Sequence, residues 1–246
     1  MKITALGVGE AFEEQMHNTS FLIENDCTML IDCGYSAVRQ IWKYNASADF
    51  LDIIYISHFH ADHYFGLPAL LFRMKEDGRK NPLTIISHRG AKSKINTLMK
   101  MAYKYSLLSM GFKINFKEVK HGMQLKVNEL ELQFARTVHA VPNLAVKVSH
   151  NGSSVAFSGD GLFLKTTEPL YRDVDLLINE CYYASKSSSV HATLKDVLPM
   201  AERNNVKKLL LVHIGRAEKE AVKKIVSAYT GPVKVIIPRE GYQVGL

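Results

Sequence analysis

The residues with the clearest chemistry form the run Ser57-His58-Phe59-His60-Ala61-Asp62-His63, which holds three histidines and one aspartate. Imidazole nitrogens and carboxylate oxygens are the ligands that zinc and related divalent metals prefer. Alternate residues that leave a strand converge on one point when the chain turns, so His58 and His60 can bind one ion. Asp62 and His63 face another direction as the chain enters a helix. They can bind a second ion.

Three further candidate ligands each follow an apolar run later in the chain. They are His139, Asp160 and His213. Because open α/β sheets form their sites where strands stop, these side chains can join the first group. The predicted two-metal site has His58, His60 and His139 on one ion, Asp62, His63 and His213 on the other, and Asp160 bridging the two.

This ligand set predicts hydrolysis. Two divalent ions held roughly 3.5–4 Å apart can share a water, lower its pKa, and stabilise the entering and leaving oxygens of a displacement. We therefore expect a metal-dependent hydrolase in which a metal-bound hydroxide attacks the substrate. The cofactors are expected to be two divalent ions, with zinc favoured, although manganese and iron suit the same His and Asp set.

The elements that must position these residues are short strands and helices. Strands are expected near residues 3–8, 20–24, 27–32, 51–57, 83–87, 114–119, 130–138, 145–149, 155–158, 176–179, 208–212 and 234–237. Helices are expected near residues 36–45, 95–108, 194–204 and 218–228. No Pro- or Gly-rich linker divides the chain. We therefore predict two sheets packed face to face with helices outside, as one α/β domain over residues 1–246.

The composition is that of an ordinary globular protein, with 47% hydrophobic and 22% charged residues. No stretch approaches the ~20 apolar residues of a membrane span, and residues 1–4 lead into a strand rather than into a secretory signal. The three cysteines include no CxxC pair, which favours free thiols over a disulfide framework. These features predict a cytoplasmic protein that does not bind membranes.

The formal net charge of +7 favours an anionic partner without specifying one. RNA could bind the region 73–104, where the positive charge is concentrated. A solvated helix face explains this charge equally well, because only Tyr103 and Tyr105 supply aromatic rings nearby. The cations of this region are Arg73, Lys75, Arg79, Lys80, Arg89, Lys92, Lys94, Lys100 and Lys104, against Glu76 and Asp77.

The motifs together resemble the metallo-β-lactamase superfamily, whose signature is the HxHxDH run followed by His, Asp and His at later strand ends. The resemblance covers nearly the whole chain, and it implies the four-layer αββα sandwich of the metallo-β-lactamase fold. The ribonuclease Z-like branch, which contains phosphodiesterases, is the most similar. It resembles this chain at Gly7-Val8-Gly9, His17-Asn18-Thr19-Ser20, Ile31-Asp32-Cys33-Gly34 and Phe157-Ser158-Gly159-Asp160.

A second constellation is similar to the ribonuclease Z pattern in which a glutamate orients a histidine. Here Glu180 ends a predicted strand and His191 precedes a helix. The resemblance implies that protonated His191 stabilises phosphoryl charge and protonates the leaving alkoxide, a role worth roughly 10² to 10⁴ in rate. Asp62, Glu180 and His191 are therefore the predicted catalytic residues. Asp32 is expected to support the ligands by hydrogen bonding rather than to bind metal.

The substrate is specified less well than the reaction, because pocket walls come from loops. No Gly/Pro-rich insertion resembles the arm with which ribonuclease Z clamps transfer RNA, so a nucleotide or another small phosphodiester is the expected substrate. The resemblance also implies a homodimer. The alternatives are an arylsulfatase-like hydrolase, a ribonuclease acting on RNA, and a non-catalytic metal-binding module.

Overall fold

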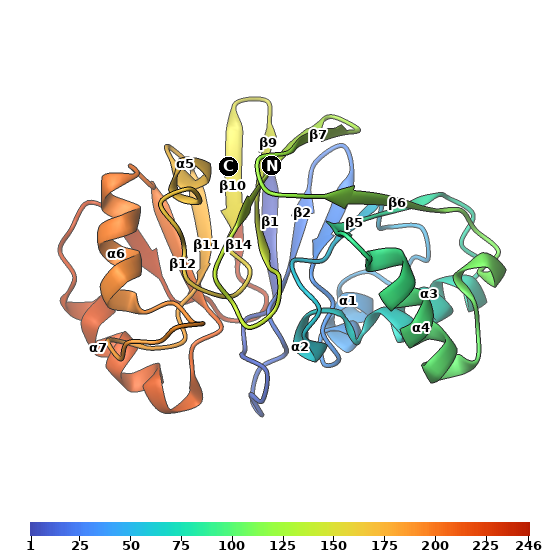
Figure 1. Cartoon of the computed structure of the whole chain (residues 1–246), viewed down its shortest axis with the longest axis horizontal. Coiled ribbons are helices and arrows are strands. Elements are labelled where there is room, and N and C mark those ends of the chain that lie inside the picture. Colours follow the sequence, from blue (N-terminus) through green and yellow to red (C-terminus); the bar gives the residue numbers. More distant parts are fainter.

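Two seven-stranded sheets pack face to face in the computed structural model, which describes all 246 residues (Figure 1). The first sheet has the order β14 (Gln243–Gly245), β1 (Lys2–Gly7), β2 (Ser20–Glu24), β3 (Thr28–Ile31), β4 (Ile53–Tyr55), β5 (Leu83–His88) and β6 (Ile114–Val119). The second has the order β13 (Lys234–Ile236), β12 (Lys208–Val212), β11 (Leu176–Glu180), β10 (Ser153–Phe157), β9 (Leu144–His150), β8 (Leu130–Arg136) and β7 (Gln124–Val127).

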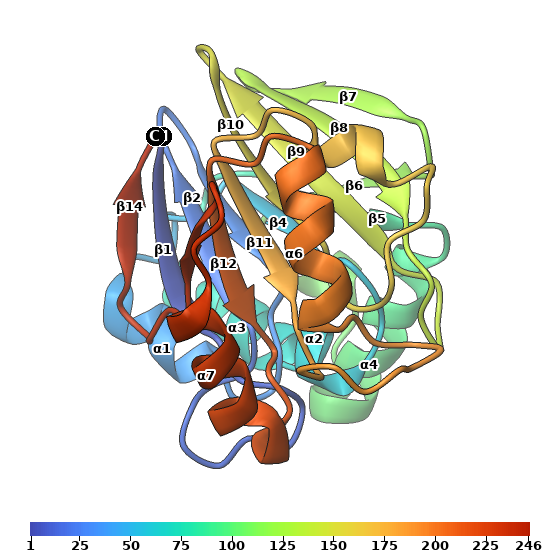
Figure 2. The same ribbon diagram turned by 90° about the vertical axis from the view of Figure 1, so that its left-hand side faces the viewer.

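The helices lie on the outer sides of the two sheets (Figures 1 and 2). On one side are α1 (Val38–Tyr44), α2 (Ala61–Tyr64), α3 (Leu67–Glu76) and α4 (Ala91–Tyr103), and on the other are α5 (Glu168–Tyr171), α6 (Leu194–Arg203) and α7 (Lys219–Ala228). The predicted α/β fold class with an αββα order of layers is confirmed. No helix has the length and apolar character that crossing a membrane requires.

Parallel pairing brings the strand ends that carry the candidate ligands to one edge. Strands β3, β4, β5 and β6 run parallel in the first sheet. Strands β10, β11, β12 and β13 run parallel in the second. Because the carboxyl ends of parallel strands share an edge, the loops that follow β4, β10 and β12 can converge there. Helix α2, which follows β4, marks this edge at the bottom of Figure 1.

The two sheets are joined by a core of buried apolar side chains from both inner faces. Phe21 of β2 and Phe157 of β10 meet across it with ring centroids 6.4 Å apart. Tyr55 of β4 and Phe134 of β8 form a second aromatic pair with centroids 5.8 Å apart. This shared core holds the two halves of the site in register.

Loss of the Phe21 ring is expected to destabilise the fold strongly. Phe21 is fully buried, so Phe21→Ala removes a large apolar group and leaves a cavity, at a cost of about 3–5 kcal/mol in the free energy of unfolding. Urea denaturation followed by fluorescence measures this change. Phe12→Ala is the matched control, because its ring is 71% exposed and should contribute little. Equal effects for the two variants would contradict a core that spans both sheets.

Two expectations about the basic region are wrong. The helix expected over 95–108 ends at Tyr103, because Lys104 turns into the left-handed region at φ 55°. The apolar pattern predicts too long a helix because it continues into a separate 3₁₀ turn. In that turn Leu107 is buried and Leu108 is 90% exposed. Arg79, one of the cations expected on a solvated helix face, is only 2% exposed.

The Arg79 guanidinium binds backbone carbonyl groups and is not exposed for contact with RNA. It donates hydrogen bonds at 2.6–3.0 Å to the carbonyl oxygens of Ala48, Leu51, Asn81 and Pro82. These hydrogen bonds give the buried guanidinium the polar partners that a buried cation requires.

The two edge strands β7 and β14 are absent from the predicted strands. Each is short and has no buried side chain, so neither shows an apolar pattern in the sequence.

Candidate metal centre

Asp160 lies between the two groups of predicted ligands. Its turn after β10 is flanked by Gly159 at φ 60° and Gly161 at φ 103°. A Cβ at Gly161 would lie 2.2 Å from the carbonyl oxygen of Val138, so this turn needs a residue without a side chain. The local backbone therefore presents the Asp160 carboxylate at the convergence of the strand ends.

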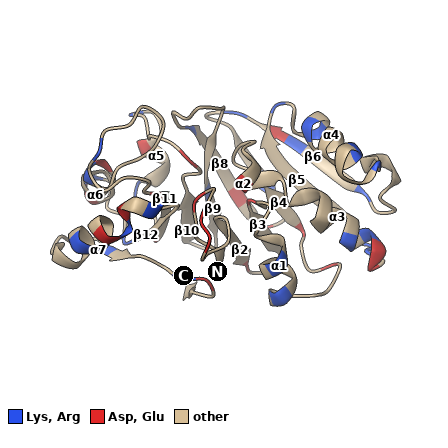
Figure 3. Cartoon of the chain, turned by 90° about the horizontal axis from the view of Figure 1, so that it is seen from below, with Lys and Arg blue, Asp and Glu red and all other residues tan.

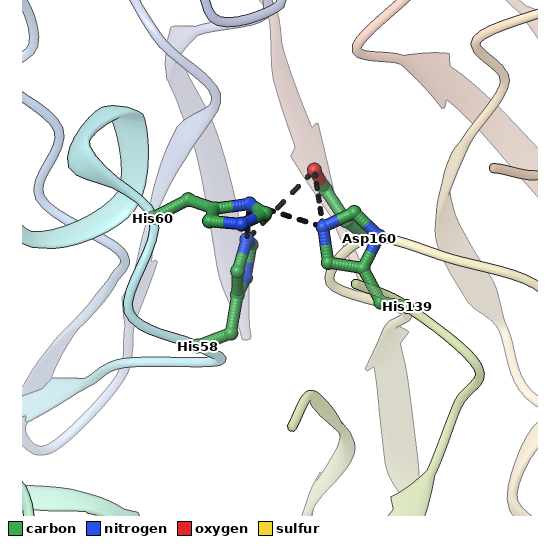
Figure 4. Close-up of side chains that lie close together, drawn as sticks. All are labelled: His58, His60, His139 and Asp160. Carbon is green, nitrogen blue, oxygen red and sulfur yellow. Dashed lines mark hydrogen bonds and ion pairs between the residues drawn. The ribbon is translucent and has the colours of Figure 1, made fainter. Parts of the chain in front are cut away.

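The first group brings His58, His60 and His139 to Asp160 (Figure 4). Nε2 of His58 and Nε2 of His139 lie 3.2 and 3.1 Å from Nδ1 of His60. Each of these two Nε2 atoms lies 3.9 Å from Oδ2 of Asp160. Ligands bound at 2.0–2.1 Å to a tetrahedral ion are about 3.4 Å apart, so this spacing suits one divalent ion.

The second group brings Asp62, His63 and His213 to the other side of Asp160. Nε2 of His63 lies 3.1 Å from Oδ2 of Asp62 and 3.5 Å from Oδ1 of Asp160. Nε2 of His213 lies 3.2 Å from Oδ2 of Asp62 and 3.3 Å from Oδ2 of Asp160. The two carboxylate oxygens of Asp160 thus reach both groups, as a bridging ligand must.

The chemistry of the donor atoms also fits metal ions. Nε2 of His63 is buried, and it has no hydrogen-bond partner. Unprotonated imidazole nitrogens and carboxylate oxygens are all acceptors, so their convergence requires either protons or cations between them. Both groups therefore have the composition and spacing to hold one divalent ion each.

The charges of the centre favour cations at the second position. Burial by itself would lower the pKa of His213, but Asp160, Glu180 and Asp62 outweigh it and raise that pKa to about 9. Burial likewise opposes a charge on His63, yet Asp160 and Asp62 raise its pKa well above the ordinary value. The negative field that stabilises these imidazolium ions would equally attract a divalent cation.

The first position is different, because burial dominates at His58. Its pKa lies well below the ordinary value, with desolvation as the largest cause and the neighbouring His63 as the second. His58 is therefore neutral, which is the form that binds metal. Burial opposes the charge of Asp160, but the imidazoles of His213 and His63 hold its pKa well below the usual range.

Asp32 contacts one ligand of the second group directly and one ligand of the first group through Ser57. Its buried carboxylate accepts hydrogen bonds from the backbone N–H and the hydroxyl of Ser57, both at 2.7 Å. It also lies 2.7 Å from Nδ1 of His63, and Ser57 Oγ lies 3.0 Å from Nδ1 of His58. These bonds leave the Nε2 atoms of both histidines for metal. The structure thus places Asp32 where it can support the ligands, and it adds Ser57, which stands directly before the HxHxDH motif and links Asp32 to His58.

The change Asp32→Asn is expected to weaken metal binding about 10- to 100-fold, because partners of ligating histidines set the ring orientation and basicity. Competition with a chromophoric chelator measures the affinity. Asp26→Asn is the matched control, since the Asp26 side chain is 78% exposed beside His150 and away from the ligands. An Asp32→Asn protein with the affinity of the unmodified chain would rule out this role.

Glu180 and His191 lie beside the second group. Oε1 of Glu180 contacts Nδ1 of His191, while Oε2 accepts hydrogen bonds from the N–H groups of Gly161 at 2.6 Å and Ala192 at 3.2 Å. Both oxygens of this buried carboxylate therefore have donors. This arrangement suits an orienting residue better than a metal ligand, although Glu180 and His191 also lie within reach of Asp160 and His213.

The environment of His191 favours its protonated form. Burial alone would lower its pKa, but the hydrogen bond and charge of Glu180 outweigh this and raise the pKa above the ordinary value. The ring of Tyr182 stacks on His191, with centroids 4.5 Å apart and an interplanar angle of 26°. Sequence reasoning missed Tyr182, since no motif includes it. Its only signal is its place two residues after Glu180.

Residues 1–230 match the family described as Anti-Pycsar protein Apyc1. The chain is 25% identical to a ribonuclease Z of Methanosarcina acetivorans, over 92% of this chain and 91% of that protein. It is also 25% identical to a ribonuclease Z of Geobacillus kaustophilus, over 92% of each.

Solved structures share the fold. The metallo-β-lactamase fold protein YhfI from Bacillus subtilis superimposes with a TM-score of 0.83 at 23% identity, covering 99% of this chain and 98% of that one. The short form of human tRNase Z gives a TM-score of 0.82 at 20% identity, covering 100% and 99%. The predicted metallo-β-lactamase superfamily fold and the ribonuclease Z-like resemblance are confirmed.

Proposed function

Because the chain belongs to the Anti-Pycsar protein Apyc1 family and is a metal-dependent hydrolase, we propose that it is a dinuclear-metal phosphodiesterase. Its proposed substrate is a nucleotide or another small phosphodiester. The observation that carries the proposal is the Glu180–His191 pair beside a ligand set for two ions. An acid next to two Lewis acids suits a displacement at phosphorus with a poor leaving group.

Two divalent ions, zinc in our proposal, would activate a water and neutralise charge on the phosphoryl oxygens. The side chain of His191, oriented by Glu180, would protonate the leaving group. The Nδ1–H group of His191 donates a hydrogen bond to Glu180, so Nε2 can carry the second proton of the imidazolium. As the bond from phosphorus to the leaving oxygen breaks, that proton passes to the alkoxide. Glu180 holds the ring in place and stabilises the charged form before transfer.

A substrate panel tests this function on the metal-loaded protein. Bis(p-nitrophenyl) phosphate, 3′,5′-cyclic nucleotides, a short RNA and p-nitrophenyl sulfate should be offered in parallel, with zinc and with manganese. We expect hydrolysis of the phosphodiesters. Cleavage of the sulfate alone would favour an arylsulfatase-like enzyme. Cleavage of RNA alone, with steep salt dependence, would favour a ribonuclease.

Elemental analysis distinguishes the non-catalytic alternative. We propose two bound ions per chain after reconstitution. Fewer than one ion per chain, together with no hydrolysis of any substrate, would indicate a protein that keeps the fold without the reaction. The proposed homodimer rests on the family resemblance, and light scattering of the purified protein measures it.

A further inference from the structure

A cavity of about 590 Å³ is lined by residues that neighbour the first group of ligands along the chain. Its volume falls within the roughly 300–1,000 Å³ of small-molecule sites. Phe59, which stands between the ligands His58 and His60, forms one wall. The segment Val141–Leu144, which follows the ligand His139, forms another. The cavity therefore shares two segments of backbone with the metal centre.

The remaining lining is strongly basic. Arg89, Lys94, Lys120 and Arg136 border the cavity, and no carboxylate does. The ion pairs that Lys and Arg form in this structure involve other residues, so none of these four cations is neutralised by a partner. Figure 3 shows Lys and Arg on α4 and β6, the elements that lead into this cavity. Unpaired cations of one sign around a concave site raise the local concentration of anions.

A buried polar atom in the wall also lacks a partner. Nε2 of His88, at the end of β5, is shielded from solvent and makes no hydrogen bond. Its ring packs against Phe59 at 4.5 Å between centroids, which holds the imidazole at the cavity. Because an unmade hydrogen bond at a buried atom is costly, a ligand that supplies the missing partner would be favoured there.

Part of the lining is apolar. Phe59, Val141, Pro142 and Leu144 give the cavity hydrophobic surface next to its cations, and Nζ of Lys94 lies 5.4 Å from the centre of the Phe59 ring. A phosphate ion has no apolar part that could bury this surface, whereas the sugar and base of a nucleotide can cover it. The combination of cations, an unpartnered imidazole and an apolar wall matches a molecule with one anionic and one flat apolar part.

We propose that this cavity binds a nucleoside monophosphate, and that the metal centre supplies it as product. The inference rests on the proposed phosphodiesterase function. Hydrolysis adds water across one P–O bond: phosphorus gains a hydroxyl oxygen, and the leaving alkoxide gains a proton. A phosphodiester with one negative charge thus becomes a phosphomonoester with nearly two at pH 7. The cavity's four cations favour that dianion over the substrate, so the cavity would hold the product in preference to the substrate.

Calorimetric titration of the metal-loaded full-length protein with adenosine 5′-monophosphate tests the proposal. The double variant Lys94→Ala/Lys120→Ala removes two cations of the cavity. We expect it to bind the nucleotide roughly tenfold more weakly, the scale of two exposed charge pairs. The matched control is Lys92→Ala/Lys117→Ala, which removes two exposed lysines from α4 and β6 that do not line this cavity. Its affinity should be unchanged.

Inorganic phosphate and adenosine, each titrated alone, identify the ligand. Weaker binding of both than of the nucleotide supports a nucleotide site. Phosphate binding as tight as the nucleotide's, and equally dependent on Lys94 and Lys120, would show that the ligand is free phosphate and overturn the assignment. Equal nucleotide affinity in the double variant and the unmodified chain would overturn the site itself.

Inhibition by the nucleotide separates this inference from the proposed function. With bis(p-nitrophenyl) phosphate as substrate, the inhibition constant for adenosine 5′-monophosphate should rise about tenfold in the double variant and stay constant in the control. If the double variant and the control hydrolyse the substrate with the same inhibition constant for the nucleotide, the assignment of the cavity as the nucleotide site is wrong. Lysine-dependent nucleotide binding by a protein that cleaves no phosphodiester would overturn the proposed function and the product assignment, but not the site.

Discussion

The variant Asp160→Asn is expected to lose activity by roughly three orders of magnitude and to bind fewer than two metal ions per chain. Oδ1 of Asp160 faces His63 at 3.5 Å, whereas Oδ2 faces His213 at 3.3 Å and the first group at 3.9 Å. An amide offers one neutral oxygen and an N–H₂ group that repels cations, so it cannot bridge. Metal ions stabilise the transition state by several kcal/mol, and each 1.36 kcal/mol is a factor of ten.

Elemental analysis of the reconstituted variant and its rate with bis(p-nitrophenyl) phosphate check this expectation together. Asp26→Asn again serves as the control for loss of one carboxylate, because that side chain is exposed and remote from the centre. A circular dichroism spectrum like that of the unmodified chain establishes that the variant is folded. Two tightly bound ions with normal activity in Asp160→Asn would contradict the bridging assignment.

The second large effect is expected for His191→Ala, and its size should depend on the leaving group. General acid catalysis contributes about 10² to 10⁴ in rate when the leaving group is a basic alkoxide. A p-nitrophenolate ion leaves without a proton, so bis(p-nitrophenyl) phosphate should suffer much less. Steady-state rates for one alkyl and one p-nitrophenyl phosphodiester give the comparison. Equal losses for both substrates would indicate a structural role for His191 rather than an acid.

The pH dependence offers an independent check through Glu180. The pKa of His191 is raised, so its proton persists to higher pH, and the rate should fall as pH rises through that raised value. Glu180→Gln removes the charge that opposes the effect of burial. The alkaline limb of kcat against pH should therefore move to lower pH in this variant. An unshifted limb would mean that another group sets it.

Much of this site was predictable because its motifs are local. The run His58 to His63 places four candidate ligands, three histidines and one aspartate, at one strand end. The pattern of an apolar strand followed by a polar residue indicated His139, Asp160 and His213. The structure brings these residues together as expected. The two-sheet architecture was also predictable, since alternating strands and helices without a linker leave few other ways to bury the apolar faces.

Other features depend on residues that are far apart in the chain. Arg79 reads as a surface cation until the fold closes carbonyl groups around it. The ring of Tyr182 acquires meaning only when it stacks on His191.

The chemistry of the ligands can be recognised from the amino-acid sequence, because the spacing of residues along one strand end is a local property. The surroundings of those ligands come from the tertiary structure. The basic cavity combines Arg89 and Lys94 with Lys120 and Arg136, which come from separate segments. Such neighbours meet because strand order and sheet packing bring distant loops to one edge, and no local pattern records that approach.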